Sequence, residues 1–181
     1  MDRLKRNIIA IIIISLLSPI VHAQSYGVSL SYTLVATDPE NMRGGQVMFI
    51  YDPERFKWRN FNIYFDGGYS YFYVTNYHHH RSLSILSAAP VIRYRFKQRG
   101  PIKPFLDLSV GVSYLSHTRL EEHNLGMHFA FQDRIGVGIV IGKQDQLSLG
   151  LSIIHYSNAD LCEHNRGISV PVMLNAQYKF A

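Results

Sequence analysis

The sequence predicts an all-β protein, an eight-stranded antiparallel up-and-down transmembrane β-barrel. Apolar and polar residues alternate with a period of two along several long segments, which is typical of strands with one apolar face. After residue 23 no run of 18 consecutive apolar residues occurs, and this excludes a helical membrane span there. The polar face of the alternating segments consists mainly of Ser, Gly, Asn and Gln, which suits the filled interior of a narrow barrel.

The first 23 residues are predicted to be a secretory signal peptide. Arg3, Lys5 and Arg6 form a basic start, and an apolar run of about ten residues follows over 8–17. The small residue Ala23 ends a sequence typical of a cleavage site. The apolar run is too short for a transmembrane helix. We therefore expect residues 24–181 to form a single outer-membrane barrel domain.

Five of the predicted strands show the alternation clearly, and in chain order they cover 26–34, 60–71, 104–115, 146–157 and 170–180. The segment 104–115 is an example, because Leu106, Leu108 and Val110 alternate with Asp107 and Ser109. The remaining three predicted strands cover 45–52, 83–97 and 126–141. The connections between the eight strands are alternately longer and shorter, which predicts long loops at one end of the barrel and tight turns at the other.

A soluble eight-stranded lipid carrier would alternate in the same way, with its apolar face inward. Its outward face would be rich in Lys and Glu, whereas the polar face here is mostly uncharged. Aromatic residues also gather near the predicted strand ends, as expected for the interface girdles of a membrane barrel. They are Tyr51, Trp58, Phe61, Tyr94, Phe96, Tyr178 and Phe180. These features favour the outer membrane over a soluble barrel.

The seventh predicted strand carries a candidate catalytic pair. Its apolar face continues from Ile153 to His155 and Ser157, and the period of two places both polar residues on the lipid face with Cα atoms about 7 Å apart. A histidine close to a serine can act as base and nucleophile. The alternative is that both side chains lie in the headgroup zone, where polar residues cost little free energy.

The longer string from His155 to Ala159, followed by Asn165-x-Gly167, resembles the lipid A 3-O-deacylase (PagL) family of outer-membrane barrels. Phe131-x-Asp133 on the preceding strand resembles a second short pattern of that family. The resemblance implies an esterase that hydrolyses an acyl ester of lipid A. By the same resemblance, Ser157 is the nucleophile, His155 the general base and Asn158 part of the oxyanion hole.

Two positions depart from the family pattern. Where the family has an acid that orients the histidine, this chain has Ser169, which parity with Val170 predicts to point inward. Where the family tends to have Gly after S-N-A, this chain has Asp160, with a negative charge and less backbone freedom. Asp133 is the first candidate for a substitute acid, because a three-residue turn between strands six and seven places it opposite His155. Glu163 in the last long loop is the second candidate, and a site without any acid is the third.

The family resemblance, the loop arginines and the net charge also indicate which partners the protein has. The expected partners are lipid A or lipopolysaccharide of the outer leaflet, the membrane itself and the barrel assembly machinery. Each long loop carries one arginine, namely Arg43, Arg81, Arg119 and Arg166. These arginines either bind lipopolysaccharide phosphates or are scattered solubilising charges. Without residues 1–23 the net charge falls from +5 to 15 − 12 = +3, which is too mild to imply nucleic acid. No cofactor or metal is predicted, although histidines gather in the loops at 78–80, 117, 123 and 164. A catalytically silent barrel that binds lipopolysaccharide or is structural is the alternative function.

Overall fold

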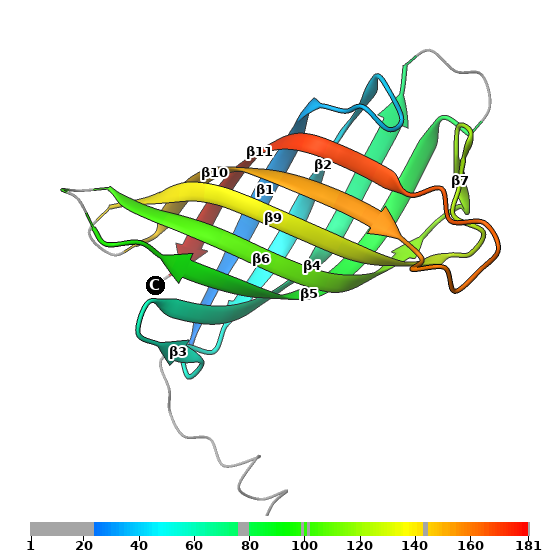
Figure 1. The fold of residues 1–181 in the computed structure, drawn as a ribbon. Coiled ribbons are helices and arrows are strands. Elements are labelled where there is room, and N and C mark those ends of the chain that lie inside the picture. The colour runs from blue at the N-terminus through cyan, green and yellow to red at the C-terminus, as the bar shows by residue number, and fades with distance from the viewer. Residues whose placement is uncertain (1–23, 76–79, 99, 101, 143–144, 181) are drawn as a thin grey trace, which may run out of the picture.

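The computed structural model describes residues 24–75, 80–98, 100, 102–142 and 145–180. They form a closed antiparallel barrel of eight long strands (Figure 1). The strands are β1 (Ser25–Val35), β2 (Met42–Asp52), β4 (Phe61–Val74), β5 (Ser82–Arg95), β6 (Lys103–Leu115), β9 (Phe129–Ile141), β10 (Leu147–Ser157) and β11 (Ile168–Phe180). Pairing of β1 with β11 closes the sheet, so no long strand is left with an open edge. The predicted signal peptide over 1–23 lies outside the described residues.

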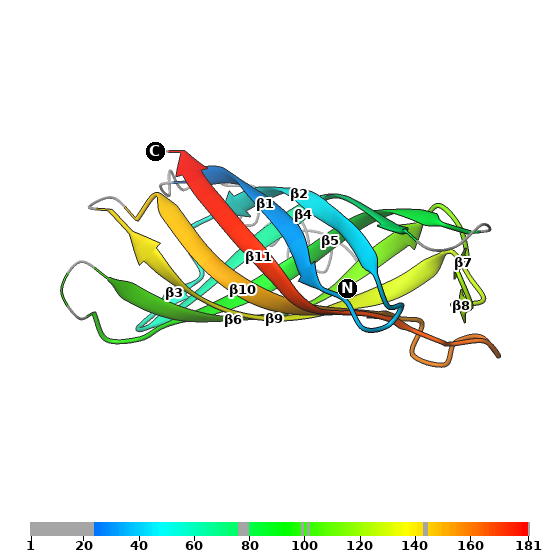
Figure 2. The same ribbon diagram turned by 90° about the horizontal axis from the view of Figure 1, so that it is seen from above.

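The eight long strands confirm the predicted up-and-down order, because each one pairs with the long strand before it and the long strand after it. Three short strands of two residues each in the connections were not predicted: β3 (Lys57–Trp58), β7 (Arg119–Leu120) and β8 (His123–Asn124). The β7–β8 hairpin lies at the end of the barrel where β10 ends and β11 begins (Figures 1 and 2). No helix in the described part of the chain is long and apolar enough to cross a membrane.

The half of the interior near the tight turns is polar, as predicted. Arg93 is almost fully buried there and donates from Nε to Asp107 Oδ1 at 2.8 Å and from Nη2 to Asp107 Oδ2 at 2.7 Å. The same guanidinium donates to Gln177 Oε1 at 3.0 Å and to Tyr64 Oη at 3.2 Å. This network gives the buried charges the partners that they need inside a narrow barrel.

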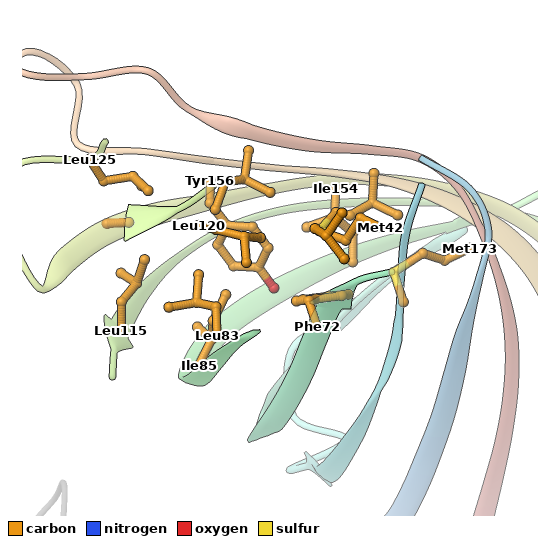
Figure 3. Close-up of a cluster of buried hydrophobic side chains, with 14 residues drawn as sticks. Met42, Phe72, Leu83, Ile85, Leu115, Leu120, Leu125, Ile154, Tyr156 and Met173 are labelled. Carbon is orange, nitrogen blue, oxygen red and sulfur yellow. The ribbon is translucent and has the colours of Figure 1, made fainter. Parts of the chain in front are cut away.

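The half of the interior near the long loops is apolar, which differs from the prediction of a polar lumen throughout. Side chains from β4, β5, β6 and β10 pack there into one cluster that includes Phe72, Leu83 and Leu115 (Figure 3). Leu120 and Leu125, from the β7–β8 region, are fully buried in the same cluster. The loops are therefore anchored on an apolar plug.

The outer surface of the barrel is apolar and carries aromatic girdles. At the turn end, Trp58 stacks on Phe61 with ring centroids 6.1 Å apart, and Tyr94 contacts Phe61 at 5.0 Å. A second set lies toward the loops, where Phe129 meets Phe131 edge to face at 5.0 Å. Aromatic side chains at both ends of an apolar band are typical of outer-membrane barrels.

The prediction that Ser169 points inward was wrong, because β11 contains a bulge. Ser152 pairs with Met173 but Ile154 pairs with Val170, so one residue of β10 faces two residues of β11. The extra residues include Pro171, which has no N–H to give to a ladder and is tolerated at bulges. Between Ile168 and Val170, on the N-terminal side of the bulge, the inward and outward positions of β11 are therefore exchanged. Val170 is buried and Ser169 lies on the outer face.

Candidate active site

His155 and Ser157 lie at the loop end of β10, on the outer face and half-buried. The alternate residues fix this orientation, because Ile154, Tyr156 and Asn158 are fully buried inside the barrel. The hydroxyl of Tyr156 accepts a hydrogen bond from Gln46 Nε2 at 2.9 Å. The strand therefore cannot rotate to bury the candidate pair without losing three core residues.

Two neighbours hold the ring of His155. Its Nδ1 is hydrogen-bonded to Ser169 Oγ at 2.8 Å, and the two residues are direct partners in the β10–β11 ladder. The ring also lies over Gly167, where a Cβ would sit 2.7 Å from Cε1 and 3.0 Å from Nε2. A glycine is therefore required beside the ring, and the ring edge that contains Nε2 faces away from Ser169.

A hydroxyl orients a histidine less strictly than a carboxylate does. A neutral imidazole must carry its proton on Nδ1 for Nε2 to act as a base. A carboxylate only accepts, so it selects that tautomer, whereas Ser169 can accept from Nδ1–H or donate to Nδ1. The hydrogen bond between Ser169 and His155 supports either tautomer, and only the first one is productive.

The two predicted acids occupy different surroundings. Asp133 on β9 is the direct ladder partner of His155, as the hairpin register predicted, and its side chain is exposed on the outer face. Glu163 is exposed in the loop between β10 and β11. Neither carboxylate hydrogen-bonds His155 in the described part of the chain. The role of each as the orienting acid stays a prediction.

Asn158 anchors the loop that follows the site. Its Nδ2 donates to Leu125 O at 2.7 Å and to His164 O at 2.8 Å. Its backbone N–H donates to Asn165 Oδ1 at 2.8 Å. All three N–H donors of Asn158 are thus used within the protein, so the predicted oxyanion role of Asn158 requires that one of these bonds be exchanged for substrate.

The turn after Asn158 offers other donors. Ala159 and Asp160 both have left-handed backbones, with φ of 53° and 59°, and Leu161 N donates to Asn158 O at 3.1 Å to close the turn. The backbone N–H groups of Ala159 and Asp160 donate to no other atom of the described residues. Two consecutive N–H groups without a partner in the described residues, two and three positions after Ser157 in the chain, are suited to an oxyanion. Sequence reasoning missed them, although the family preference for Gly after Ala159 indicated a left-handed turn.

The loop histidines do not form a metal site in the part of the chain that the structure describes, where no three His, Cys, Asp or Glu side chains are placed to hold an ion. The predicted histidine cluster falls partly outside that part, because residues 78 and 79 are not described. Of the four predicted loop arginines, Arg43, Arg81 and Arg119 are exposed, and Arg166 pairs with Glu122 at 3.6 Å.

The closed barrel, its aromatic girdles and its outward-facing His and Ser define an eight-stranded outer-membrane β-barrel with a hydrolase-like pair on its lipid-facing surface. The sequence matches the family described as Lipid A 3-O-deacylase (PagL) over residues 24–179. The chain belongs to this family.

Two curated relatives support the assignment. The lipid A deacylase PagL of Pseudomonas aeruginosa is 40% identical over 105 residues, which are 58% of this chain and 58% of the relative. The lipid A deacylase PagL of Bordetella bronchiseptica is 30% identical over 94 residues, which are 52% of this chain and 49% of the relative. The matched part is thus about half to three fifths of the length of these relatives.

Two solved structures are similar in fold. The crystal structure of the outer membrane enzyme PagL has a TM-score of 0.68 and 30% identity, and the comparison covers 84% of this chain and 98% of that one. Neisserial surface protein A has a TM-score of 0.57 and 12% identity, covering 87% of this chain and 97% of that one. At 12% identity the second likeness concerns the fold alone.

Proposed function

We propose that this protein is an outer-membrane esterase that removes the 3-O-linked acyl chain of lipid A, with Ser157 as nucleophile and His155 as general base. The observation that carries the proposal is the placement of both side chains on the outer face of a barrel of the PagL family, with His155 Nδ1 hydrogen-bonded to Ser169. A substrate in the outer leaflet reaches such a pair sideways from the membrane.

In the proposed reaction, Ser157 Oγ attacks the ester carbonyl while His155 Nε2 accepts the hydroxyl proton. The negative charge on the carbonyl oxygen is stabilised by N–H donors after the strand. The bond between the carbonyl carbon and the sugar oxygen then breaks, which leaves the acyl chain on Ser157 Oγ, and His155 gives the proton to the leaving sugar oxygen. A water molecule, activated by His155 in the same way, releases the acyl chain as a fatty acid and regenerates Ser157.

The experiment compares lipid A from cells with and without the protein by mass spectrometry. The proposal expects a mass loss equal to one ester-linked acyl chain in cells that express it. Ser157→Ala and His155→Asn should each abolish the loss, and the double variant should be no worse because the two residues act as a unit. Full deacylation by Ser157→Ala in a folded barrel would refute the proposal.

The second candidate function is a catalytically silent barrel that binds lipopolysaccharide or is structural. Ser169 and Asp160 favour it, because the first removes a charge that would stabilise imidazolium and the second adds one beside the developing oxyanion. Unchanged lipid A in cells with a correctly inserted barrel would support this second function. In either case we expect the barrel assembly machinery to insert the chain.

A further inference from the structure

Ser169, which is hydrogen-bonded to His155, is itself fixed by a residue that lies outside the long strands of the barrel. Ser169 is near the beginning of β11, and the regular pairing of β1 with β11 stops at Val35 and Val172. Beyond that point, Asp38 from the β1–β2 loop forms an isolated bridge with Ser169. Asp38 O accepts a hydrogen bond from Ser169 N at 2.8 Å. Asp38 thus supplies the partner that β1 no longer provides.

Asp38 is in turn fixed by the β7–β8 hairpin. Its carboxylate hydrogen-bonds His123 Nε2, and a carboxylate only accepts, so Nε2 carries the proton. The side chain of His123 is only 4% exposed. Leu120 and Leu125, close to it in sequence, are buried in the apolar plug. His123 is therefore a rigid donor, whereas Asp38 belongs to a surface loop and is half-exposed.

From these contacts we infer that Asp38 and His123 are positioning residues for His155, which act through Ser169. The chain of hydrogen bonds runs from the apolar plug to the catalytic ring through His123, Asp38 and Ser169. It fixes the backbone from which the Ser169 hydroxyl reaches Nδ1. Such a clamp matters most where a hydroxyl replaces the carboxylate, because no charge attraction then keeps the ring in place. The inference deepens the proposed function and rests on it.

The test is a double-mutant cycle between Asp38 and Ser169, measured as kcat and KM on purified lipid A in detergent. Asp38→Ala should lower kcat roughly ten- to hundredfold, since small displacements of a catalytic group have effects of this size, and should leave KM nearly unchanged. In a Ser169→Ala background, Asp38→Ala should have no further effect on kcat. Asp38→Asn retains an acceptor oxygen for His123 and should restore most of the activity.

The matched control is Asp145→Ala. Asp145 also ties a connection to the barrel, through Arg95 Nη1 at 3.0 Å, but at the turn end, and its loss should leave kcat unchanged. The inference is overturned by an equal loss in both backgrounds, by a change in KM alone, or by Asp38→Asn being as slow as Asp38→Ala.

A spectroscopic readout separates this inference from the proposed function. Nitrogen-15 NMR of the His155 ring should show a change in the Nδ1 signal between the wild type and Asp38→Ala, because loss of the clamp weakens the hydrogen bond between Nδ1 and Ser169 Oγ. A protein that shows this change but releases no acyl chain would refute the proposed function alone. If the enzyme is active and the His155 ring signals are the same in the wild type and in Asp38→Ala, the clamp alone is refuted.

Discussion

At the scale of single residues, the space beside His155 is set by Gly167. A Cβ there would lie 2.7 Å from His155 Cε1 and 2.7 Å from Tyr156 O, so either the ring or the start of β11 must move. We expect Gly167→Ala to lower turnover by about a hundredfold or more while the barrel still forms, as measured by lipid A release and gel mobility. Gly67→Ala is the control, because its Cβ would meet only ordinary contacts of 3.4 Å or more. Equal activity of the two variants would contradict the role of Gly167.

Two carboxylates, those of Asp133 and Glu163, are the candidates for the acid that supports His155. Asp133 is opposite His155 in the ladder, where the Cβ atoms of facing residues lie about 5 Å apart, so its negative charge favours the imidazolium of His155 that forms in the reaction. We therefore expect Asp133→Asn to lower turnover at least tenfold, which is a barrier increase of about 1.4 kcal/mol. Glu163→Gln should change little, because Glu163 is exposed in the loop. Release kinetics for both folded variants check this, and normal turnover in Asp133→Asn would remove Asp133 from the site.

At the scale of elements, the turn after β10 combines strain with an unfavourable charge. Asp160 has φ of 59° and accepts a hydrogen bond from Asn165 Nδ2 at 2.9 Å. In Asp160→Gly, relief of the left-handed backbone by roughly 1 kcal/mol offsets the lost bond of about 1 kcal/mol. Stability should therefore change little, while turnover should rise several-fold because a negative charge leaves the oxyanion region. Slower release by Asp160→Gly would show that the carboxylate has a positive role.

The sequence allowed some elements to be predicted better than others. The register of β9 with β10 followed from the length of one turn, and the pairing of Asp133 with His155 confirmed it. The orientation of Ser169 could not follow from periodicity, because a bulge reverses the faces of a strand. Pro171 within the final strand was the available signal for the bulge. The Asp38 bridge joins residues 131 positions apart, and no local pattern indicates such a contact.

At the scale of the whole molecule, the interior of the barrel consists of an apolar half and a polar half, which have different roles. The apolar plug supports the loops and the candidate site, and its signal in the sequence was that apolar residues occupy both faces near the loop ends of strands, as at Tyr114 and Leu115 or Ile153 and Ile154. The polar half contains Arg93 and Asp107, far along the strands from His155. We therefore expect substitutions in the polar half to change the stability of the barrel without changing catalysis.

The buried pair in the polar half provides the test of this separation. Arg93→Met leaves Asp107 buried without its cation, and removal of one partner of a buried ion pair costs about 3–5 kcal/mol. We expect a loss of this size in the free energy of unfolding, measured by urea titration in detergent micelles, with unchanged deacylation per folded molecule. The double variant Arg93→Met/Asp107→Leu should be more stable than Arg93→Met alone, because no buried charge is then left unpaired. The Arg93 guanidinium lies over the ring of Phe105, with Cζ 3.8 Å from the ring centroid, so Phe105 gives the methionine an apolar neighbour in both variants. If the double variant were the less stable of the two, the polar half would depend on its hydrogen-bond network as a whole rather than on the balance of this one pair.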